Sequence, residues 1–181
     1  MSPTSTVPNA QLTHIGILVR DMDNMIAFYQ RVMGLKLIDR GAIGPRELAF
    51  LSRSPEEHHQ LVLVCDPTTP APEKSTVGQL AFRLDDLEGL RTYHRLLAGW
   101  QVPGLEGRNH GNSWSLYCFD PEGNKIELYV PTPWQFRQPW REALDLEQPA
   151  AAIVERTEQL AREIPGTMPL AQWQAQWHAS F

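Results

Sequence analysis

The chain has 181 residues and a formal net charge of -5, with 42% hydrophobic and 20% charged residues. This length and composition fit one globular domain with its own core. A mildly acidic chain without a basic cluster offers no electrostatic basis for binding nucleic acid or an anionic membrane. Neither a signal-peptide pattern nor an apolar run of about 20 residues is found, so we expect a cytoplasmic protein without a membrane partner.

Two stretches of the chain repeat the same order of elements, one beginning at His14 and the other at Gln79. Each opens with an alternating strand that ends in Asp, at Asp21 and Asp85, and Asp is a good helix N-cap. One-face apolar spacing predicts helices over 22–33 and 87–98, each followed by Gly. Three further strands are expected after each helix, near 35–40, 47–52 and 58–65, and then near 100–103, 113–119 and 124–129.

The repeat predicts an α+β fold of two tandem βαβββ modules, about 12–65 and 78–131, that form a cupped mixed sheet. Together they make a domain over 11–133, with a proline-rich linker at 66–72. Residues 134–181 form a helical extension, with one helix from Pro149 to about Glu163 and another from about Pro169. Its apolar stripes should pack on the protein's own surface, join a homodimer or close over a cavity.

Alternation also predicts which side chains face away from the helices. His14, Gln79 and Glu127 fall on the face opposite the apolar one, among small residues that leave room for a ligand. A polar set in a cavity needs water, a ligand or a metal to satisfy it. Along 58–65, His59, Leu61 and Leu63 share a face, and we take that face as the inward one.

Several phrases in the chain resemble the vicinal-oxygen-chelate superfamily, which includes glyoxalases, bleomycin-resistance proteins and dioxygenases. The resemblance is strongest to single-domain type I extradiol dioxygenases, which are similar to catechol 2,3-dioxygenase. The phrases that carry it are Leu12-Thr13-His14-Ile15-Gly16, His58-His59-Gln60-Leu61, His110-Gly111-Asn112 and Asp120-Pro121-Glu122-Gly123-Asn124-Lys125-Ile126-Glu127-Leu128.

In such dioxygenases Fe(II) is held by two His and one Glu, with adjacent positions open for substrate and dioxygen. By resemblance, His14 and Glu127 are two of these ligands, and Gln79 stands where the second His is expected. Gln79 then either completes an altered site or marks weakened metal binding. The resemblance further implies that His59 is the acid–base histidine, with a pKa near its ordinary value, and that His110 and Tyr117 contact substrate or oxygen.

The leading hypothesis is therefore a metal-dependent extradiol dioxygenase that cleaves a catechol-like aromatic vicinal diol with dioxygen. Fe(II) is the expected metal, and Mn(II) or another divalent ion is the alternative. One alternative function is a glyoxalase- or epimerase-type isomerase or lyase. The other is a non-catalytic small-molecule-binding protein of the bleomycin-resistance kind.

Overall fold

The computed structural model describes residues 10–68 and 77–179, so the expected linker at 66–72 and the last residues of the tail lie partly outside the described residues. The chain divides into two compact units. The described residues of the amino-terminal unit are 10–68, 77, 78 and the turn 120–124, and those of the carboxy-terminal unit are 79–119 and 125–179. Within the described ranges, no helix combines the length and apolar character needed to cross a membrane.

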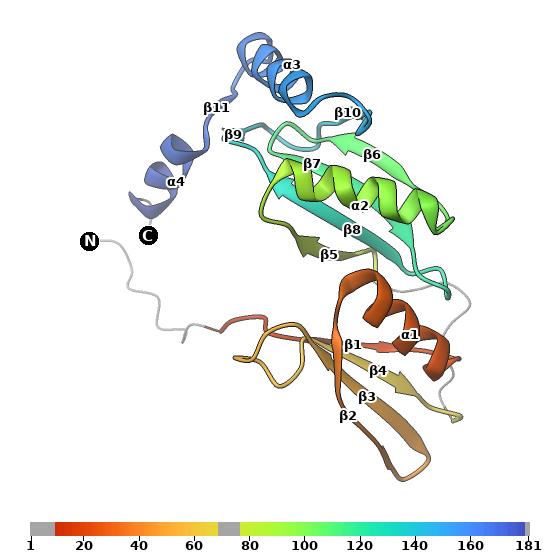
Figure 1. The fold of residues 1–181 in the computed structure, drawn as a ribbon. Helices are drawn as coiled ribbons and strands as arrows, with labels where there is room; N and C mark the ends of the chain where they lie inside the picture. Colours follow the sequence, from red (N-terminus) through yellow and green to blue (C-terminus); the bar gives the residue numbers. More distant parts are fainter. Residues whose placement is uncertain (1–9, 69–76, 180–181) are drawn as a thin grey trace. The chain divides into compact units, whose positions relative to one another are not determined.

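The amino-terminal unit is a four-stranded sheet with one helix, as shown in Figure 1. The strands lie in the order β1-β4-β3-β2, with β1 parallel to β4 and the other neighbours antiparallel. This is the βαβββ order that the sequence predicts. The elements are β1 (Ile15–Leu18), α1 (Met22–Met33), β2 (Lys36–Ile43), β3 (Arg46–Ser52) and β4 (Leu61–Cys65).

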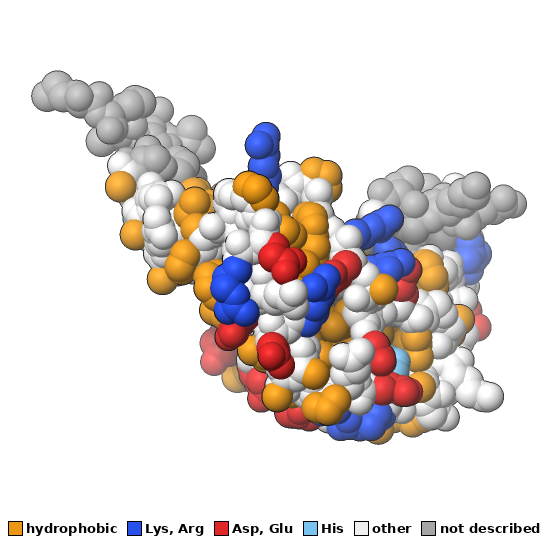
Figure 2. All heavy atoms as spheres, turned by 90° about the horizontal axis from the view of Figure 1, so that it is seen from above, with side chains coloured by type: hydrophobic (Ala, Val, Ile, Leu, Met, Phe, Trp, Pro, Cys, Tyr) orange, Lys and Arg blue, Asp and Glu red, His pale blue; other side chains and the backbone are white. Residues whose placement is uncertain are grey.

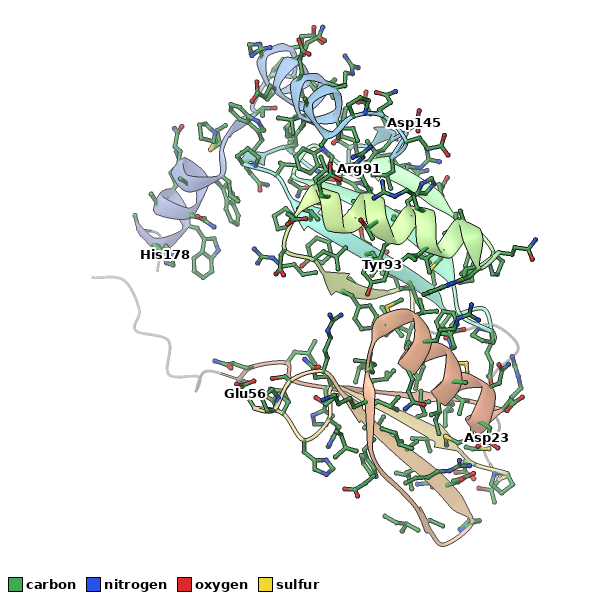
Figure 3. The ribbon with its side chains drawn as sticks, viewed as in Figure 1. Asp23, Glu56, Arg91, Tyr93, Asp145 and His178 are labelled. Atoms are coloured by element: carbon green, nitrogen blue, oxygen red, sulfur yellow. The ribbon has the colours of Figure 1, made fainter. Side chains whose placement is uncertain are left out.

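Helix α1 has the ends that its sequence predicts. The Asp21 side chain accepts a hydrogen bond from the backbone N–H of Asn24, and Gly34 ends the helix at a φ of 64°. Such a left-handed residue favours glycine because a side chain is strained there. The buried face of α1 includes Met25 and Tyr29, both 0% exposed. Asp23, in the first turn, pairs with Arg40 (Figure 3).

The predicted inward face of β4 is wrong. Ile15 and Ile17 of β1 are parallel partners of Leu61 and Leu63, so all four lie on one face of the sheet. Leu61 and Leu63 are only 2% and 0% exposed, which places them in the core and not in a polar cavity. His59 precedes the strand, so the strand's alternation does not fix the direction of its side chain.

The turn 120–124 is organised by the buried carboxylate of Asp120. It accepts hydrogen bonds from the backbone N–H groups of Glu122 and Asn124, from the Asn124 amide, and from the Tyr29 hydroxyl at 2.9 Å. Gly123 has a φ of 83°, which a residue with a Cβ rarely adopts. The predicted tight turn is confirmed.

The carboxy-terminal unit is a five-stranded sheet in the order β10-β6-β7-β8-β5, with β5 parallel to β8 and the other pairs antiparallel (Figure 1). Its sheet elements are β5 (Leu80–Arg83), β6 (Glu106–Asn109), β7 (Ser113–Phe119), β8 (Lys125–Pro131) and β10 (Glu142–Ala143). A separate pair joins β9 (Trp134–Gln135) to β11 (Met168–Pro169). The helices are α2 (Leu87–Gly99), α3 (Ala150–Glu163) and α4 (Leu170–Ala179).

Two predictions in this unit are wrong. The strand expected at 100–103 is the turn that ends α2: Gln101 has a φ of 57°, and the Val102 N–H bonds back to the Leu97 carbonyl. The pairing strand is β6 at Glu106–Asn109, whose polar composition lacks the apolar alternation of a typical strand. The N-cap of α2 is Asp86, one residue after the predicted Asp85.

Helices α2 and α3 contribute the apolar core of this unit. Leu90 and Leu97 of α2 are fully buried, as are Leu116 of β7 and Ile126 of β8. Burying each such side chain contributes about 1.5–3 kcal/mol relative to exposure. The Arg91 side chain of α2 bonds the Leu146 carbonyl and so ties the segment before α3 to the helix (Figure 3).

The extension joins the unit mainly through α3. Its Thr157 hydroxyl, 1% exposed, accepts hydrogen bonds from the Trp114 indole and the Asn109 amide. Helix α4 is different, because Trp173 and Trp177 remain 38% and 48% exposed.

The face in Figure 2 shows acidic and basic side chains interspersed with apolar ones and no continuous block of either charge.

Candidate functional site

A buried carboxylate, that of Glu127 on β8, lies at the centre of the candidate site. Glu127 is 8% exposed. Its Oε2 accepts a hydrogen bond from the Gln79 amide nitrogen at 2.6 Å, and its Oε1 accepts one from the Tyr117 hydroxyl at 2.8 Å. Among the described residues it forms no ion pair with any Lys, Arg or His. Buried charges are normally paired with an opposite charge or bound to a metal.

Strand pairing explains why these groups meet. Tyr117 of β7 is the cross-strand partner of Glu127, and Ala81 of β5 is its partner on the other side. Gln79 lies just before β5, and its hydrogen bond to Glu127 places its amide beside the carboxylate. The small Ala81 side chain leaves space beside the carboxylate.

The hydrogen-bonded chain continues from Tyr117 to His110. His110 Nε2 lies 3.0 Å from the Tyr117 hydroxyl, and Nδ1 lies 3.1 Å from the backbone carbonyl of Trp140. A carbonyl only accepts, so Nδ1 carries a proton. The three contacts, Trp140 O to His110, His110 to Tyr117, and Tyr117 to Glu127, need one proton each.

Neutral imidazole, neutral phenol and ionised carboxylate together supply two protons, one fewer than these three contacts need. With those two protons, the Tyr117 hydroxyl donates either to Glu127 or to His110 Nε2 at any one time. The Tyr117 hydroxyl thus links the His110 imidazole to the Glu127 carboxylate.

The phenol itself stays protonated in this chain. Burial, followed by the hydrogen bond to Glu127 and its charge, raises the pKa of Tyr117 well above its ordinary value. Nearby Ser115 acts weakly in the opposite direction, although its Oγ makes no hydrogen bond of normal geometry. Lys125 lies over the Tyr117 ring, with Nζ 4.0 Å from the ring centroid.

The extension holds His110 in place. Gln138 donates from its amide to the His110 carbonyl at 2.8 Å. Gly111, at a φ of 77°, lies directly against the fully buried Phe136 ring, where a Cβ would overlap the ring. The Thr132 hydroxyl donates to the Gly111 carbonyl. The histidine's backbone and Nδ1 are thus both fixed by residues after β8.

A second group of candidate residues lies in the amino-terminal unit. The His14 and His59 rings meet edge to face with centroids 4.5 Å apart, and Phe50 packs against His59 at 5.1 Å. His58 is exposed, and its Nε2 lies 2.8 Å from an Asp39 carboxylate oxygen. The structure therefore brings His14 and His59 together, with His58 turned to Asp39.

The pKa of His59 departs from the expectation of an ordinary value. Burial lowers it first, and the neighbouring charges of His14 and His58 lower it further. His59 is therefore more readily neutral than a free histidine, and a neutral imidazole is the form that accepts a proton.

The donor atoms suit a divalent metal in chemistry. His14 Nδ1 is 3.2 Å from the Thr13 hydroxyl, while Nε2 has no hydrogen-bond partner among the described residues. An imidazole with one nitrogen oriented and the other open is the usual state of a metal-binding histidine. In Gln79, the amide oxygen likewise has no described partner. No group of three His, Cys, Asp or Glu side chains able to hold a metal occurs in the described part of the chain. The predicted ligand set differs from such a group because one of its three members, Gln79, is an amide.

In the carboxy-terminal unit, hydrogen bonds connect four of the predicted residues: Gln79, Glu127, Tyr117 and His110. In the amino-terminal unit, a ring contact joins two more, His14 and His59. Their roles, and the joint ligand set of His14, Gln79 and Glu127, stay predictions. Sequence reasoning missed Trp140, which acts through its backbone carbonyl and leaves no side-chain signal.

Comparison with known proteins identifies the family. Residues 11–128 match the Glyoxalase/Bleomycin resistance protein/Dioxygenase superfamily, and the chain belongs to it. It is 34% identical over 122 residues to the Uncharacterized protein YwbC of Bacillus subtilis (strain 168), covering 66% of this chain and 96% of that protein. It is 30% identical to Biphenyl-2,3-diol 1,2-dioxygenase 3 of Rhodococcus globerulus, over 66% of this chain and 63% of the relative. With Catechol-2,3-dioxygenase of Bacillus subtilis (strain 168) it shares 33% identity, over 68% of this chain and 44% of that enzyme.

Solved structures show the same fold. A glyoxylase/bleomycin resistance protein/dioxygenase domain from Frankia sp. EAN1pec matches with a TM-score of 0.59 and 19% identity, over 69% of this chain and all of that one. The trypanothione-dependent glyoxalase I of Leishmania major matches at 0.53 and 21%, over 86% and 97%. The fosfomycin resistance protein FosX of Listeria monocytogenes, a complex with Mn(II), matches at 0.55 and 17%, over 69% and 95%. The predicted α+β superfamily fold is confirmed.

Proposed function

We propose that this protein is a divalent-metal-dependent extradiol dioxygenase that cleaves a catechol-like aromatic diol with dioxygen. The residues that would hold the metal, Fe(II) first and Mn(II) as the alternative, are His14, Gln79 and Glu127. A bound metal would hold the diol and dioxygen together and supply the electronic path between them. Two dioxygenases of about 30% identity support this choice within the superfamily.

One observation carries the proposal: Glu127 is a buried carboxylate whose described partners are all neutral donors. Burying an ionised carboxylate without a cation costs several kcal/mol. A bound divalent cation removes that cost, and Gln79 can turn its amide to offer the oxygen in place of the nitrogen.

The residues proposed for proton transfer suit a diol because they can accept and return protons. A catechol must lose protons to bind through both oxygens, and neutral His59 is suited to accept one. Tyr117 stays protonated and donates to a nearby oxygen. His110, fixed at Nδ1 by Trp140, presents Nε2 to the same phenol and can pass a proton along this chain.

Metal analysis followed by a ring-cleavage assay tests the proposal. The purified protein, loaded anaerobically with Fe(II) or Mn(II), should bind one equivalent and turn over at least one member of a catechol panel. Glu127→Gln should lose the metal, and Glu155→Gln, an exposed change of the same kind on α3, should retain it. Failure to bind metal under any loading, or stoichiometric metal with no cleavage across the panel, refutes the proposal.

Gln79→His gives a second test of the metal site. Imidazole is a stronger donor than an amide to these metals, so the variant should bind Fe(II) more tightly than wild type by at least about tenfold. Unchanged affinity would remove Gln79 from the ligand set. The Gln79–Glu127 hydrogen bond favours one competing function, a metal-free binding protein, which predicts no metal in either form.

A further inference from the structure

A second row of polar side chains crosses the five-stranded sheet beside the row that holds Glu127. Strand pairing sets Arg108 of β6 opposite Ser115 of β7, Ser115 opposite Tyr129 of β8, and Tyr129 opposite Arg83 of β5. Ser115 precedes Tyr117 by two residues, so this row lies on the same face as Tyr117 and Glu127. These four residues include two arginines and no acidic side chain.

Two neighbouring atoms of this row are buried without a hydrogen-bond partner. Ser115 is 0% exposed, and its Oγ has no partner among the described residues. The Nε of Arg108, its cross-strand neighbour, is also buried and unpartnered, although a terminal nitrogen of the same guanidinium pairs with Glu106. Leaving buried polar groups unmatched is energetically costly. Both can donate a hydrogen bond, so the missing partner is an acceptor.

The charge of the row makes an anion the best acceptor. Arg83 forms no ion pair with a described residue, whereas Arg108 is paired with Glu106 through a terminal nitrogen and keeps its Nε unpartnered. Arginine matches a carboxylate in shape and charge, and a hydroxyl beside it adds a further donor.

We propose that Arg108 and Ser115 bind a carboxylate on the substrate, so that the natural substrate is an acidic aromatic diol. The inference rests on the proposed function, because the diol end is assigned to the row of Tyr117 and Glu127. Two residues along a strand span about 6.7 Å, close to the distance between substituents at opposite ends of a benzene ring. A diol at one row therefore places a para carboxylate at the next.

Binding measurements with three small probes test this proposal. The metal-loaded protein is titrated calorimetrically, without dioxygen, with 3,4-dihydroxybenzoate, with its uncharged amide 3,4-dihydroxybenzamide, and with benzoate, which has no diol. The acid should bind at least about tenfold more tightly than the amide, as expected for charge-assisted hydrogen bonds. Ser115→Ala and Arg108→Gln should each reduce this preference severalfold or more. Arg95→Gln, which removes the same charge from an exposed site on α2, should not.

The outcomes separate the carboxylate contact from the diol function. Equal binding of acid and amide overturns the carboxylate contact and leaves the dioxygenase proposal standing. Benzoate binding that Arg108→Gln abolishes, with no contribution from the diol, supports the contact and overturns the diol assignment. Binding of none of the probes overturns both. If Arg108→Gln does not fold, Arg108→Lys keeps the charge without the Nε donor and should still weaken the preference.

Discussion

Removing one hydroxyl, in Tyr117→Phe, tests whether the buried hydrogen-bonded chain stabilises the fold. The change deletes the 2.8 Å bond to Glu127 and the 3.0 Å contact with His110. A hydrogen bond to a charged group contributes about 1.5–3 kcal/mol, and the buried carboxylate loses one of its two donors. We therefore expect the metal-free variant to lose about 2–3 kcal/mol of unfolding free energy, with little change in the denaturant slope.

Urea unfolding followed by tryptophan fluorescence, in the presence of a chelator, measures this loss. Tyr93→Phe is the matched control. Tyr93 lies on α2 (Figure 3), its hydroxyl makes no hydrogen bond with a described residue, and its loss should change stability by less than about 0.5 kcal/mol. A double-mutant cycle with Glu127→Gln should give a coupling energy of about 1 kcal/mol or more. A coupling near zero, or a Tyr117→Phe protein as stable as wild type, would refute the reasoning.

Three further predictions concern other parts of the fold. Gly111→Ala should destabilise by about 1–3 kcal/mol in thermal unfolding, because its Cβ would overlap Phe136 and its φ is 77°; an unchanged midpoint would contradict it. The pKa of Asp66 is lowered from 3.8 to about 2, first by the Thr68 hydroxyl. Its stabilisation is therefore complete above pH 3.8 and is lost as the pH falls toward 2, so Asp66→Asn should show a shallower loss of stability over that range than wild type. Tyr29→Phe removes a donor from the buried carboxylate of the 120–124 turn and should cost about 1.5–3 kcal/mol in urea unfolding; a cost below about 0.5 kcal/mol would show that this bond is dispensable.

The fold was predictable where local signals and packing agree. Helix α1 matches its predicted range because Asp21, Gly34 and the apolar spacing all specify it. Strand β6 was missed because Glu106–Asn109 is polar and becomes a strand only by pairing with β7. The β4 face was misjudged because both faces of that strand are apolar, and only the pairing with Ile15 and Ile17 distinguishes them.

The sequence indicated which residues belong to the candidate site, but it did not indicate the hydrogen bonds between them. Alternation and the family resemblance identified Glu127, Gln79 and Tyr117, which the structure joins by hydrogen bonds. The shift in the His59 pKa depends on burial and on two neighbouring histidines, which no sequence spacing reports. The Trp140 carbonyl comes from a segment without periodicity, so nothing in the sequence marks it as a partner of His110.

The backbone carbonyl of Trp140 also matters for the design of truncated and chimaeric forms of this protein. Trp140 lies beyond the 11–128 segment that defines the superfamily match, yet it fixes which nitrogen of His110 carries the first proton. A truncation at the family boundary, or a graft of another relative's tail, would leave the imidazole free to exchange tautomers. Such chimaeras would keep every predicted site side chain and still differ in how protons reach the carboxylate.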